Sequence, residues 1–233
     1  SVTDGELVIN PRTVELTSES ESKPYDGTAL TKPVVTVTGD GFVDGEVTDI
    51  KATGSVLNVS DGEVINTIVY TAGANFKNSN YSITKKEGKL SITASTEKVV
   101  VTITGNKKNE LYDGTEKVAE GYTAGIDNAL YTEADFKFTG KAEVKGTDAG
   151  TYNMGLAANQ FENANSNFAN VEFSVTDGEL VVNPRTVVLT SESGSKPYDG
   201  IALTKPVVTA TGEGFVNGEV TDVKATGSVL NVS

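Results

Sequence analysis

Hydrophobic and polar residues alternate with a period of two along most of the chain. In residues 13–17, for example, the apolar side chains are Val14 and Leu16, and the residues between and around them are Thr or Glu. Because successive side chains of a β-strand point to opposite faces, this alternation predicts strands with one buried face. Further strands are predicted at residues 34–38, 46–53, 55–59, 64–71, 81–84, 89–93, 99–104, 135–139, 151–156 and 171–175.

Turn-forming dipeptides separate these strands. They are Asp40-Gly41, Asp44-Gly45, Asp61-Gly62, Glu87-Gly88, Gly105-Asn106 and Asp177-Gly178, which supply the positive φ angles of tight hairpins. No segment shows sustained helical periodicity, and only residues 127–134 are predicted to contain a short helical turn. The fold class is therefore all-β, built from small antiparallel β-sandwich domains of the immunoglobulin-like kind. A β-grasp arrangement is the alternative, but it needs a helix across the sheet.

The sequence repeats itself. Residues 1–60 and 174–233 are identical at 52 of 60 positions, at an offset of 173. Glu15, on the polar face of its strand, becomes Val188 in the second copy, whereas Val37, which we predict to face inward, becomes Ala210. A weaker repeat lies inside the first: Tyr-Asp-Gly-Thr at residues 25–28 returns at 112–115. Two diverged units, A and B, therefore alternate.

The alternation sets the predicted domains. Residues 1–11 would be the last strand of a truncated upstream B-type repeat. An A-type repeat covers 12–93, a B-type repeat covers 94–184, and a truncated second A-type repeat covers 185–233. Proline at Asn10-Pro11-Arg12 and Asn183-Pro184-Arg185 restrains two of the three junctions. We therefore expect each repeat to have its neighbours in the same chain as partners and the array to form a rod.

Composition argues against several classes of function. The net charge of −13 has the wrong sign for binding nucleic acid, and no apolar run approaches the length of a membrane span. The chain has no His and no Cys, so the usual general base and thiol nucleophile are missing. No catalytic residues are predicted, and the protein is not expected to be an enzyme. No cofactor is expected either, apart from calcium.

A calcium site is one hypothesis for the acidic loop that contains Asp40, Asp44 and Asp49. These carboxylates are of the type that Ca²⁺ binds, but the loop lacks the full Asp-x-Asp-x-Asp-Gly pattern, and Asp44 is Asn217 in the second copy. Ordinary turn aspartates are the alternative explanation.

Two motifs carry resemblances. Residues 147–152 (Thr-Asp-Ala-Gly-Thr-Tyr) are similar to the tyrosine corner of immunoglobulin-like domains, in which the Tyr152 hydroxyl would bond back to the turn. The Lys-x-Tyr-Asp-Gly-Thr signature resembles the YDG/MBG-type tandem repeats of bacterial cell-surface, adhesin-like proteins. The signature residues are Tyr25, Asp26 and Gly27, then Tyr112, Asp113 and Gly114, then Tyr198, Asp199 and Gly200.

The YDG/MBG resemblance implies an extracellular protein on a bacterial cell surface or in the cell wall. Its favoured function is a structural stalk that projects another domain from the cell, with the Tyr-Asp-Gly residues forming a structural turn. One alternative is multivalent binding of host glycan, mucin or a matrix protein through exposed rings, for which Tyr25, Tyr112, Tyr122 and Tyr131 are the candidates. A further alternative is a non-catalytic module of a carbohydrate-active enzyme.

Overall fold

The computed structural model describes residues 1 and 3–232, and within them the chain is all-β, as predicted. The helical elements of this part are four 3₁₀ turns of three residues each: η1 (Val59–Asp61), η2 (Asn78–Asn80), η3 (Glu133–Asp135) and η4 (Ala158–Gln160). η3 overlaps the helical turn predicted at 127–134. The described residues contain no helix of the kind that a β-grasp arrangement requires, and none that is long and apolar enough to cross a membrane.

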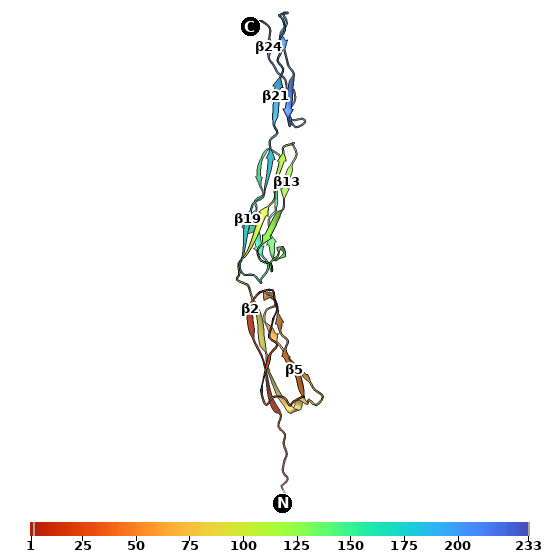
Figure 1. Cartoon of the computed structure of the whole chain (residues 1–233), viewed down its shortest axis with the longest axis vertical. Helices are drawn as coiled ribbons and strands as arrows, with labels where there is room; N and C mark the ends of the chain where they lie inside the picture. Colours follow the sequence, from red (N-terminus) through yellow and green to blue (C-terminus); the bar gives the residue numbers. More distant parts are fainter. Residues whose placement is uncertain (2, 233) are drawn as a thin grey trace. The chain divides into compact units, whose positions relative to one another are not determined.

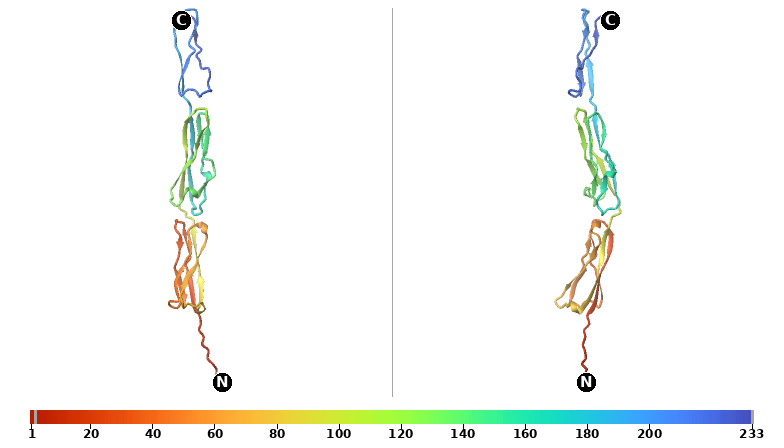
Figure 2. Two further views of the ribbon diagram at one scale, coloured as in Figure 1. Left: turned by 90° about the vertical axis from the view of Figure 1, so that its right-hand side faces the viewer. Right: turned by 180° about the vertical axis from the view of Figure 1, so that it is seen from behind.

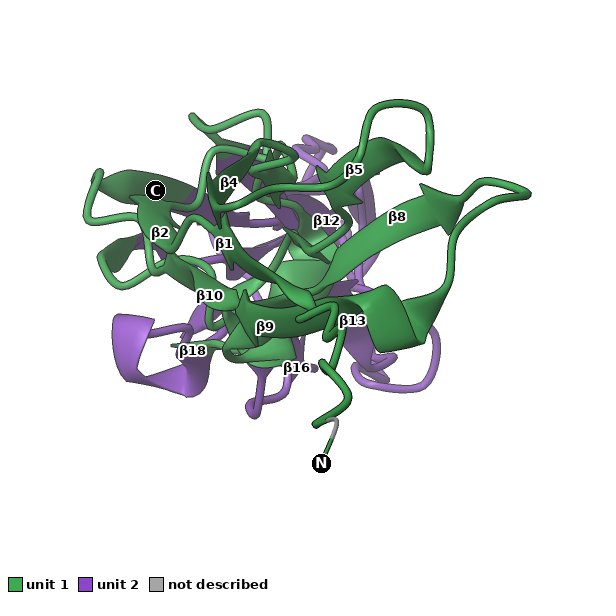
Figure 3. Ribbon diagram, turned by 90° about the horizontal axis from the view of Figure 1, so that it is seen from below, with its two compact units in different colours: residues 1–101, 126–137, 162–172 green, residues 102–125, 138–161, 173–233 purple. Residues whose placement is uncertain are grey.

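The chain divides into two compact units (Figure 3). Unit 1 comprises Ser1–Val101, Ile126–Lys137 and Glu162–Glu172, and unit 2 comprises Thr102–Gly125, Phe138–Phe161 and Phe173–Ser233. Unit 1 therefore joins the first A-type repeat to two loop-containing segments of the B-type repeat. The repeat boundaries inferred from the sequence stay a prediction.

The first A-type repeat contains ten short strands, which Figure 1 draws in red to yellow. β1 lies between β4 and β9, β10 lies between β2 and β7, and two further pairs are β3–β6 and β5–β8. The strands are β1 (Arg12–Ser18), β2 (Glu21–Pro24), β3 (Leu30–Thr31), β4 (Val35–Gly39), β5 (Val47–Ala52), β6 (Ser55–Val56), β7 (Val64–Asn66), β8 (Ile68–Ala72), β9 (Tyr81–Lys86) and β10 (Gly88–Thr93).

The B-type repeat is built in the same way. β11 pairs with β14 and β19, β20 lies between β12 and β17, and the pairs β13–β16 and β15–β18 complete the set. The strands are β11 (Val99–Gly105), β12 (Lys107–Leu111), β13 (Lys117–Glu120), β14 (Tyr122–Ile126), β15 (Phe136–Phe138), β16 (Glu143–Gly146), β17 (Gly150–Asn153), β18 (Phe161–Asn163), β19 (Val171–Thr176) and β20 (Glu179–Asn183).

The second A-type copy has fewer strands. It contains β21 (Val187–Ser191) paired with β23 (Val208–Gly212), and β22 (Leu203–Thr204) paired with β24 (Ser228–Val229). The counterpart of β2, residues 194–197, forms no strand.

Small apolar clusters hold the first A-type repeat and the B-type repeat together. In the first repeat, Val14 and Leu16 of β1 are buried with Ile68 and Tyr81, as the alternation predicted. A second cluster contains Leu30, Val56, Leu90 and Ile92. In unit 2 the cluster is formed by Ala119, Met154, Leu156, Leu180 and Val182. Burial of these side chains is the main favourable term in the folding of each repeat.

The prediction of purely antiparallel sheets is wrong. β1 pairs parallel with β9, and β2 pairs parallel with β10, while β4 and β7 pair antiparallel with the same central strands. The B-type repeat has the same arrangement, since β12 pairs parallel with β20. Hydrophobic alternation predicts which face of a strand is buried but not the direction of its neighbour, and the long chain between first and last strands allows a parallel connection.

One other expectation needs correction. Val37 was predicted to face inward, but it is 39% exposed, whereas Val35, two residues earlier on the same face of β4, is half-buried against the apolar cluster. Residues 3–10 form no strand among the described residues (Figure 2). The prediction that residues 1–11 are the last strand of an upstream B-type repeat stays a prediction, because the partner strands that it requires would belong to that repeat.

Candidate interaction site at the Tyr-Asp-Gly motif

The Tyr-Asp-Gly motif forms the same turn in all three copies. A carboxylate oxygen of Asp26 accepts a hydrogen bond from the backbone N–H of Thr28 at 2.9 Å, and Gly27 has a φ of 78°. Asp113 and Asp199 accept the equivalent bonds, from Thr115 and Ile201. The aspartate thus closes its own turn and the glycine supplies the left-handed conformation.

A lysine forms an ion pair with the aspartate of each motif. Lys23 Nζ lies 2.8 Å from Asp26 Oδ1, and Lys196 takes the same place beside Asp199. In the B-type motif the lysine follows the turn, because Lys117 pairs with Asp113 at 2.5 Å. Hydrogen bonds from the lysine ammonium, and then from Thr28, hold the pKa of the Asp26 carboxyl well below its usual range.

The first tyrosine of the motif is a packing residue. Tyr25 is half-buried and contacts the cluster that contains Leu90 and Ile92. Its ring makes an edge-on contact with the ring of Phe168, with centroids 5.4 Å apart. Phe168 belongs to the B-type repeat in sequence and to unit 1 in space. The motif therefore contributes a ring to the junction between two consecutive repeats.

An asparagine-rich loop, residues 163–170, forms the other side of this junction. Phe168 is only 3% exposed and packs edge-on against both Tyr25 and Tyr131. The Tyr131 hydroxyl donates to a side-chain oxygen of Asn163 or to the backbone oxygen of Asp135, each at 3.0 Å. Asn163 in turn donates to the Phe168 carbonyl at 2.8 Å. These bonds give the loop one defined conformation.

Asn167 reaches across the junction. Its side-chain oxygen accepts from the backbone N–H of Val59 at 2.8 Å, and its amide nitrogen donates to Asn58 Oδ1 at 3.0 Å. Asn167 is 6% exposed, so this amide is nearly shielded from water. A buried amide that uses both its donor and its acceptor is sensitive to geometry, because either group left unpaired costs free energy.

Space at the junction is also limited at Gly27. A Cβ atom added there would lie 2.8 Å from Cδ2 of Leu130, closer than real Cβ atoms approach other atoms. Ser95, between the two repeats, adds backbone bonds to the same loop. Its N–H donates to the Asn167 carbonyl, and its carbonyl accepts from the N–H of Ala169, both at 2.9 Å.

The second tyrosine of the motif also faces the following repeat, within unit 2. The Tyr112 hydroxyl donates to Glu219, which raises the pKa of Tyr112. Arg185 donates from Nη1 to the backbone oxygen of Tyr112 at 3.3 Å. A Cβ at Gly114 would lie 3.3 Å from Val216. The residues from the second A-type copy differ from those of the first junction, because here an A-type repeat follows a B-type repeat.

The four tyrosines predicted as exposed sugar-stacking rings are not exposed. Tyr25, Tyr112 and Tyr122 are half-buried, and Tyr131 is 3% exposed. Each ring is covered by neighbours: Tyr122 packs on Phe138 and Phe161, and burial raises the pKa of Tyr131 to about 12. By contrast Tyr198, in the second A-type copy, is 66% exposed.

The three aspartates of the calcium hypothesis have separate roles. Asp40 accepts from the N–H and hydroxyl of Thr13 at 2.8 and 2.9 Å. Asp49 pairs with Lys51, and Asp44 is exposed. Among residues 1 and 3–232, no group of three acidic side chains is placed to hold a metal ion. The structure therefore does not bring these three aspartates together into a cation site.

The tyrosine-corner bond is present. Tyr152 donates from its hydroxyl to the backbone oxygen of Asp148 at 2.9 Å, as the motif predicted. A Cβ at Gly146 would overlap the Tyr152 ring, so the neighbouring strand β16 needs a glycine for the ring to fit.

Comparison of the chain with models of protein families, with curated protein sequences and with solved structures found no significant match.

The sequence analysis identified the motif but missed its partners. Asn58, Asn167 and Phe168 were not singled out, although Phe168 packs against Tyr25 and Asn167 bonds to Asn58 at the same junction. The available signal was the density of asparagine in residues 163–170, which exceeds what a simple connecting loop needs.

Proposed function

We propose that the chain is a structural spacer of a bacterial surface protein, in which tandem immunoglobulin-like β repeats hold another domain away from the cell. The observation that carries this proposal is the junction at Tyr25. Consecutive repeats meet there through packed rings and a buried amide, and the connecting residues are hydrogen-bonded instead of free. A spacer requires restrained junctions of this kind, because flexible linkers let an array fold back on itself.

The interaction free energies at the junction are large enough to restrain it. The edge-on pair of Tyr25 and Phe168 adds about 0.5–1.5 kcal/mol beyond burial of its area. The two hydrogen bonds of Asn167 add about 1 kcal/mol each. Several kcal/mol is enough to make a bent-open junction a minor population.

The repetition and the motif resemblance support the cellular setting. Nearly identical copies lengthen an array without adding new chemistry, and the signature is similar to that of YDG/MBG-type surface repeats. Multivalent binding of glycan or mucin is the competing function. Its candidate rings Tyr25, Tyr112, Tyr122 and Tyr131 are at least half covered by other side chains, which favours the spacer.

Spin labels test the spacer directly. The chain has no cysteine, so exposed Ser82 and Thr151 can be replaced by labelled cysteines, one in each repeat, and their separation measured by double electron–electron resonance. We expect a single narrow distance distribution. Asn167→Ala should broaden it by leaving the Val59 N–H without its acceptor, whereas Asn159→Ala, at an exposed position, should not. A broad distribution in the parent chain would contradict the spacer.

The competing function is tested by exposing the same labelled chain to immobilised mucins, glycans and matrix proteins. We expect no saturable binding. Binding that disappears in Tyr25→Ser and Tyr112→Ser variants, shown to be folded, would assign the repeats to adhesion instead.

A further inference from the structure

We propose that the cavity where the first A-type repeat meets the B-type repeat binds a guanidinium group, supplied by an arginine side chain of a partner protein. This inference goes beyond the spacer function and does not depend on it. It rests on a comparison of two equivalent cavities, one of which is lined by an arginine of this chain.

The first cavity lies at the Tyr25 motif, within unit 1. Its volume is about 640 Å³. Tyr25, Leu130 and Phe168 give it apolar walls, and Asp26 and Glu97 bring carboxylates to its lining. The cavity therefore combines aromatic and aliphatic surface with negative charge.

The second cavity lies at the equivalent Tyr112 motif, within unit 2, and its volume is about 290 Å³. Arg185 lines this cavity and donates from Nη1 to the backbone oxygen of Tyr112 at 3.3 Å. Glu219 accepts a hydrogen bond from the Tyr112 hydroxyl. Side chains of this chain thus satisfy both the carbonyl and the hydroxyl of Tyr112.

The place of this arginine is a property of the A-type repeat. Arg185 Nε donates to the backbone oxygen of Gly214 at 2.7 Å, and Arg12 Nε donates in the same way to Gly41 at 2.9 Å. The B-type repeat begins its first strand with Val99, where the A-type repeat has Arg12. The B-type repeat therefore brings no guanidinium of its own to the Tyr25 cavity.

The Tyr25 cavity has acceptors that the chain itself does not use. The hydrogen bonds that Asp26 accepts within its turn all end on Oδ1, whereas in the other two motifs the lysine also bonds to Oδ2 of Asp113 or Asp199. Within the part of the chain that the structure describes, Glu97 forms no ion pair and the Tyr25 carbonyl accepts no side-chain hydrogen bond. A ligand with several donors would satisfy these oxygens.

These groups favour a guanidinium over other ligands. Its planar fork of N–H donors suits carboxylates and a carbonyl, and its face stacks on an aromatic ring such as that of Tyr25. An anion would meet two carboxylates, and Lys23, the cation in the lining, already donates to Asp26 and Thr28. The net charge of −13 also attracts cationic partners.

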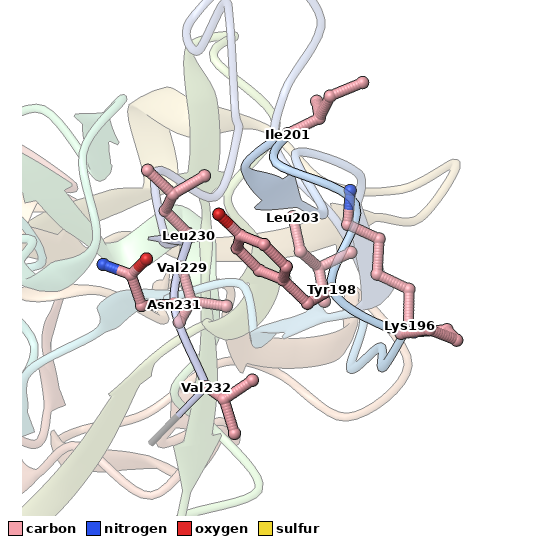
Figure 4. Close-up of a pocket in the computed structure, with 9 residues that line it drawn as sticks. Lys196, Tyr198, Ile201, Leu203, Val229, Leu230, Asn231 and Val232 are labelled. Carbon is pink, nitrogen blue, oxygen red and sulfur yellow. The ribbon is translucent and has the colours of Figure 1, made fainter.

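The cavity beside Tyr198 provides a comparison within the same chain (Figure 4). Tyr198, Leu203, Val229 and Leu230 line it. Its lining, as far as the structure describes it, includes no acidic residue. We therefore expect a guanidinium to bind at Tyr25 and not beside Tyr198.

Titration of the full chain with acetyl-arginine methylamide, followed by proton–nitrogen correlation NMR, tests the proposal. We expect saturable shifts of the Asn128 side-chain amide and the Glu97 backbone amide, with a Kd of about 1 mM. Both residues line the cavity. The citrulline analogue has nearly the same shape without the charge and should cause no shifts.

Two matched variants locate the site. Glu97→Gln should weaken binding about fivefold, because one charge-assisted hydrogen bond is lost. Glu133→Gln removes an exposed charge outside the cavity and should leave the Kd unchanged. Agmatine carries the same guanidinium without peptide groups: weaker binding than that of the blocked arginine supports a protein as the source, and tighter binding contradicts it.

The proposal is overturned if the folded parent chain shows no saturable shifts up to about 20 mM ligand, if the citrulline analogue binds equally well, or if Glu97→Gln leaves the Kd unchanged. Shifts confined to residues around Tyr198 would also overturn it. None of these results concerns the distances between spin labels, so failure here is distinguishable from failure of the spacer.

Discussion

Gly27 shows how one position serves both a turn and a junction. Its φ of 78° favours glycine for conformational reasons, and a Cβ there would lie 2.8 Å from Cδ2 of Leu130, so that side chain would have to shift. The conformational effect should be the larger one, because Leu130 is 44% exposed and its end can move. The two can be separated because Gly45 has the same φ of 78°, and a Cβ added to Gly45 would meet nothing within 4 Å.

We therefore expect Gly27→Ala to destabilise the chain more than Gly45→Ala does. Both variants should lose about 1 kcal/mol from the left-handed conformation, and Gly27→Ala should lose a smaller further amount, on the order of 0.5 kcal/mol, through the displaced Leu130 side chain. Urea unfolding followed by circular dichroism measures both. Equal losses would show that Leu130 does not constrain the turn.

The carboxyl of Asp26 predicts an acid dependence. Its folded pKa is lowered by Lys23 and Thr28, so its contribution to stability is present above the unfolded pKa of about 3.9 and is lost as pH falls through the lower folded value. We expect Asp26→Asn to be less stable than the parent at pH 7 and the difference to shrink below about pH 4. Unfolding curves at several pH values measure it, and a difference that grows in acid would contradict the assigned sign.

At the scale of elements, the junction between repeats depends on Tyr25 and the loop at 163–170. Tyr25→Ala removes the edge-on contact with Phe168 and part of the cover over Leu90. We expect a loss of about 2–4 kcal/mol in the free energy of unfolding. Tyr198→Ala changes the same residue of the second copy, where the ring is 66% exposed, and should cost less than about 0.5 kcal/mol in dilute solution. Similar losses in the two variants would contradict a junction role for Tyr25.

Strand formation shows why part of the fold was predictable from sequence. The alternation at Val14 and Leu16 predicted β1 correctly because burial of one face is a local property of the pattern. Residues 3–10 carry the same pattern as β20 and form no strand here. Leu7 and Leu180 have almost identical flanking sequences, yet only Leu180 lies in a strand, because β12 and β17 pair with it on both sides. The pattern permits a strand, and neighbouring strands decide whether it forms.

The candidate site was predictable to the same extent. The turn roles of Asp26 and Gly27 follow from residue chemistry alone. The contact of Tyr25 with Phe168 joins residues 143 positions apart in sequence, and no local pattern contains that information. The cover over the rings proposed for sugar binding was missed for the same reason, since their covering partners come from other segments of the chain.

At the scale of the whole molecule, alternation of two repeat types has a consequence for folding. The A-type copies are identical at 52 of 60 positions, but a B-type repeat separates them. Neighbours that differ in sequence exchange strands less readily during folding than identical ones do. The net charge of −13 adds mutual repulsion between chains.

The parallel pairing of first and last strands also governs how a repeat responds to mechanical load. Tension applied at residues 12 and 93 pulls β2 and β10 in opposite directions along their length. The hydrogen bonds of this ladder then resist in shear, all at once, instead of opening one after another from an end. A domain tethered through such repeats would therefore stay attached until all the hydrogen bonds between the paired strands break together.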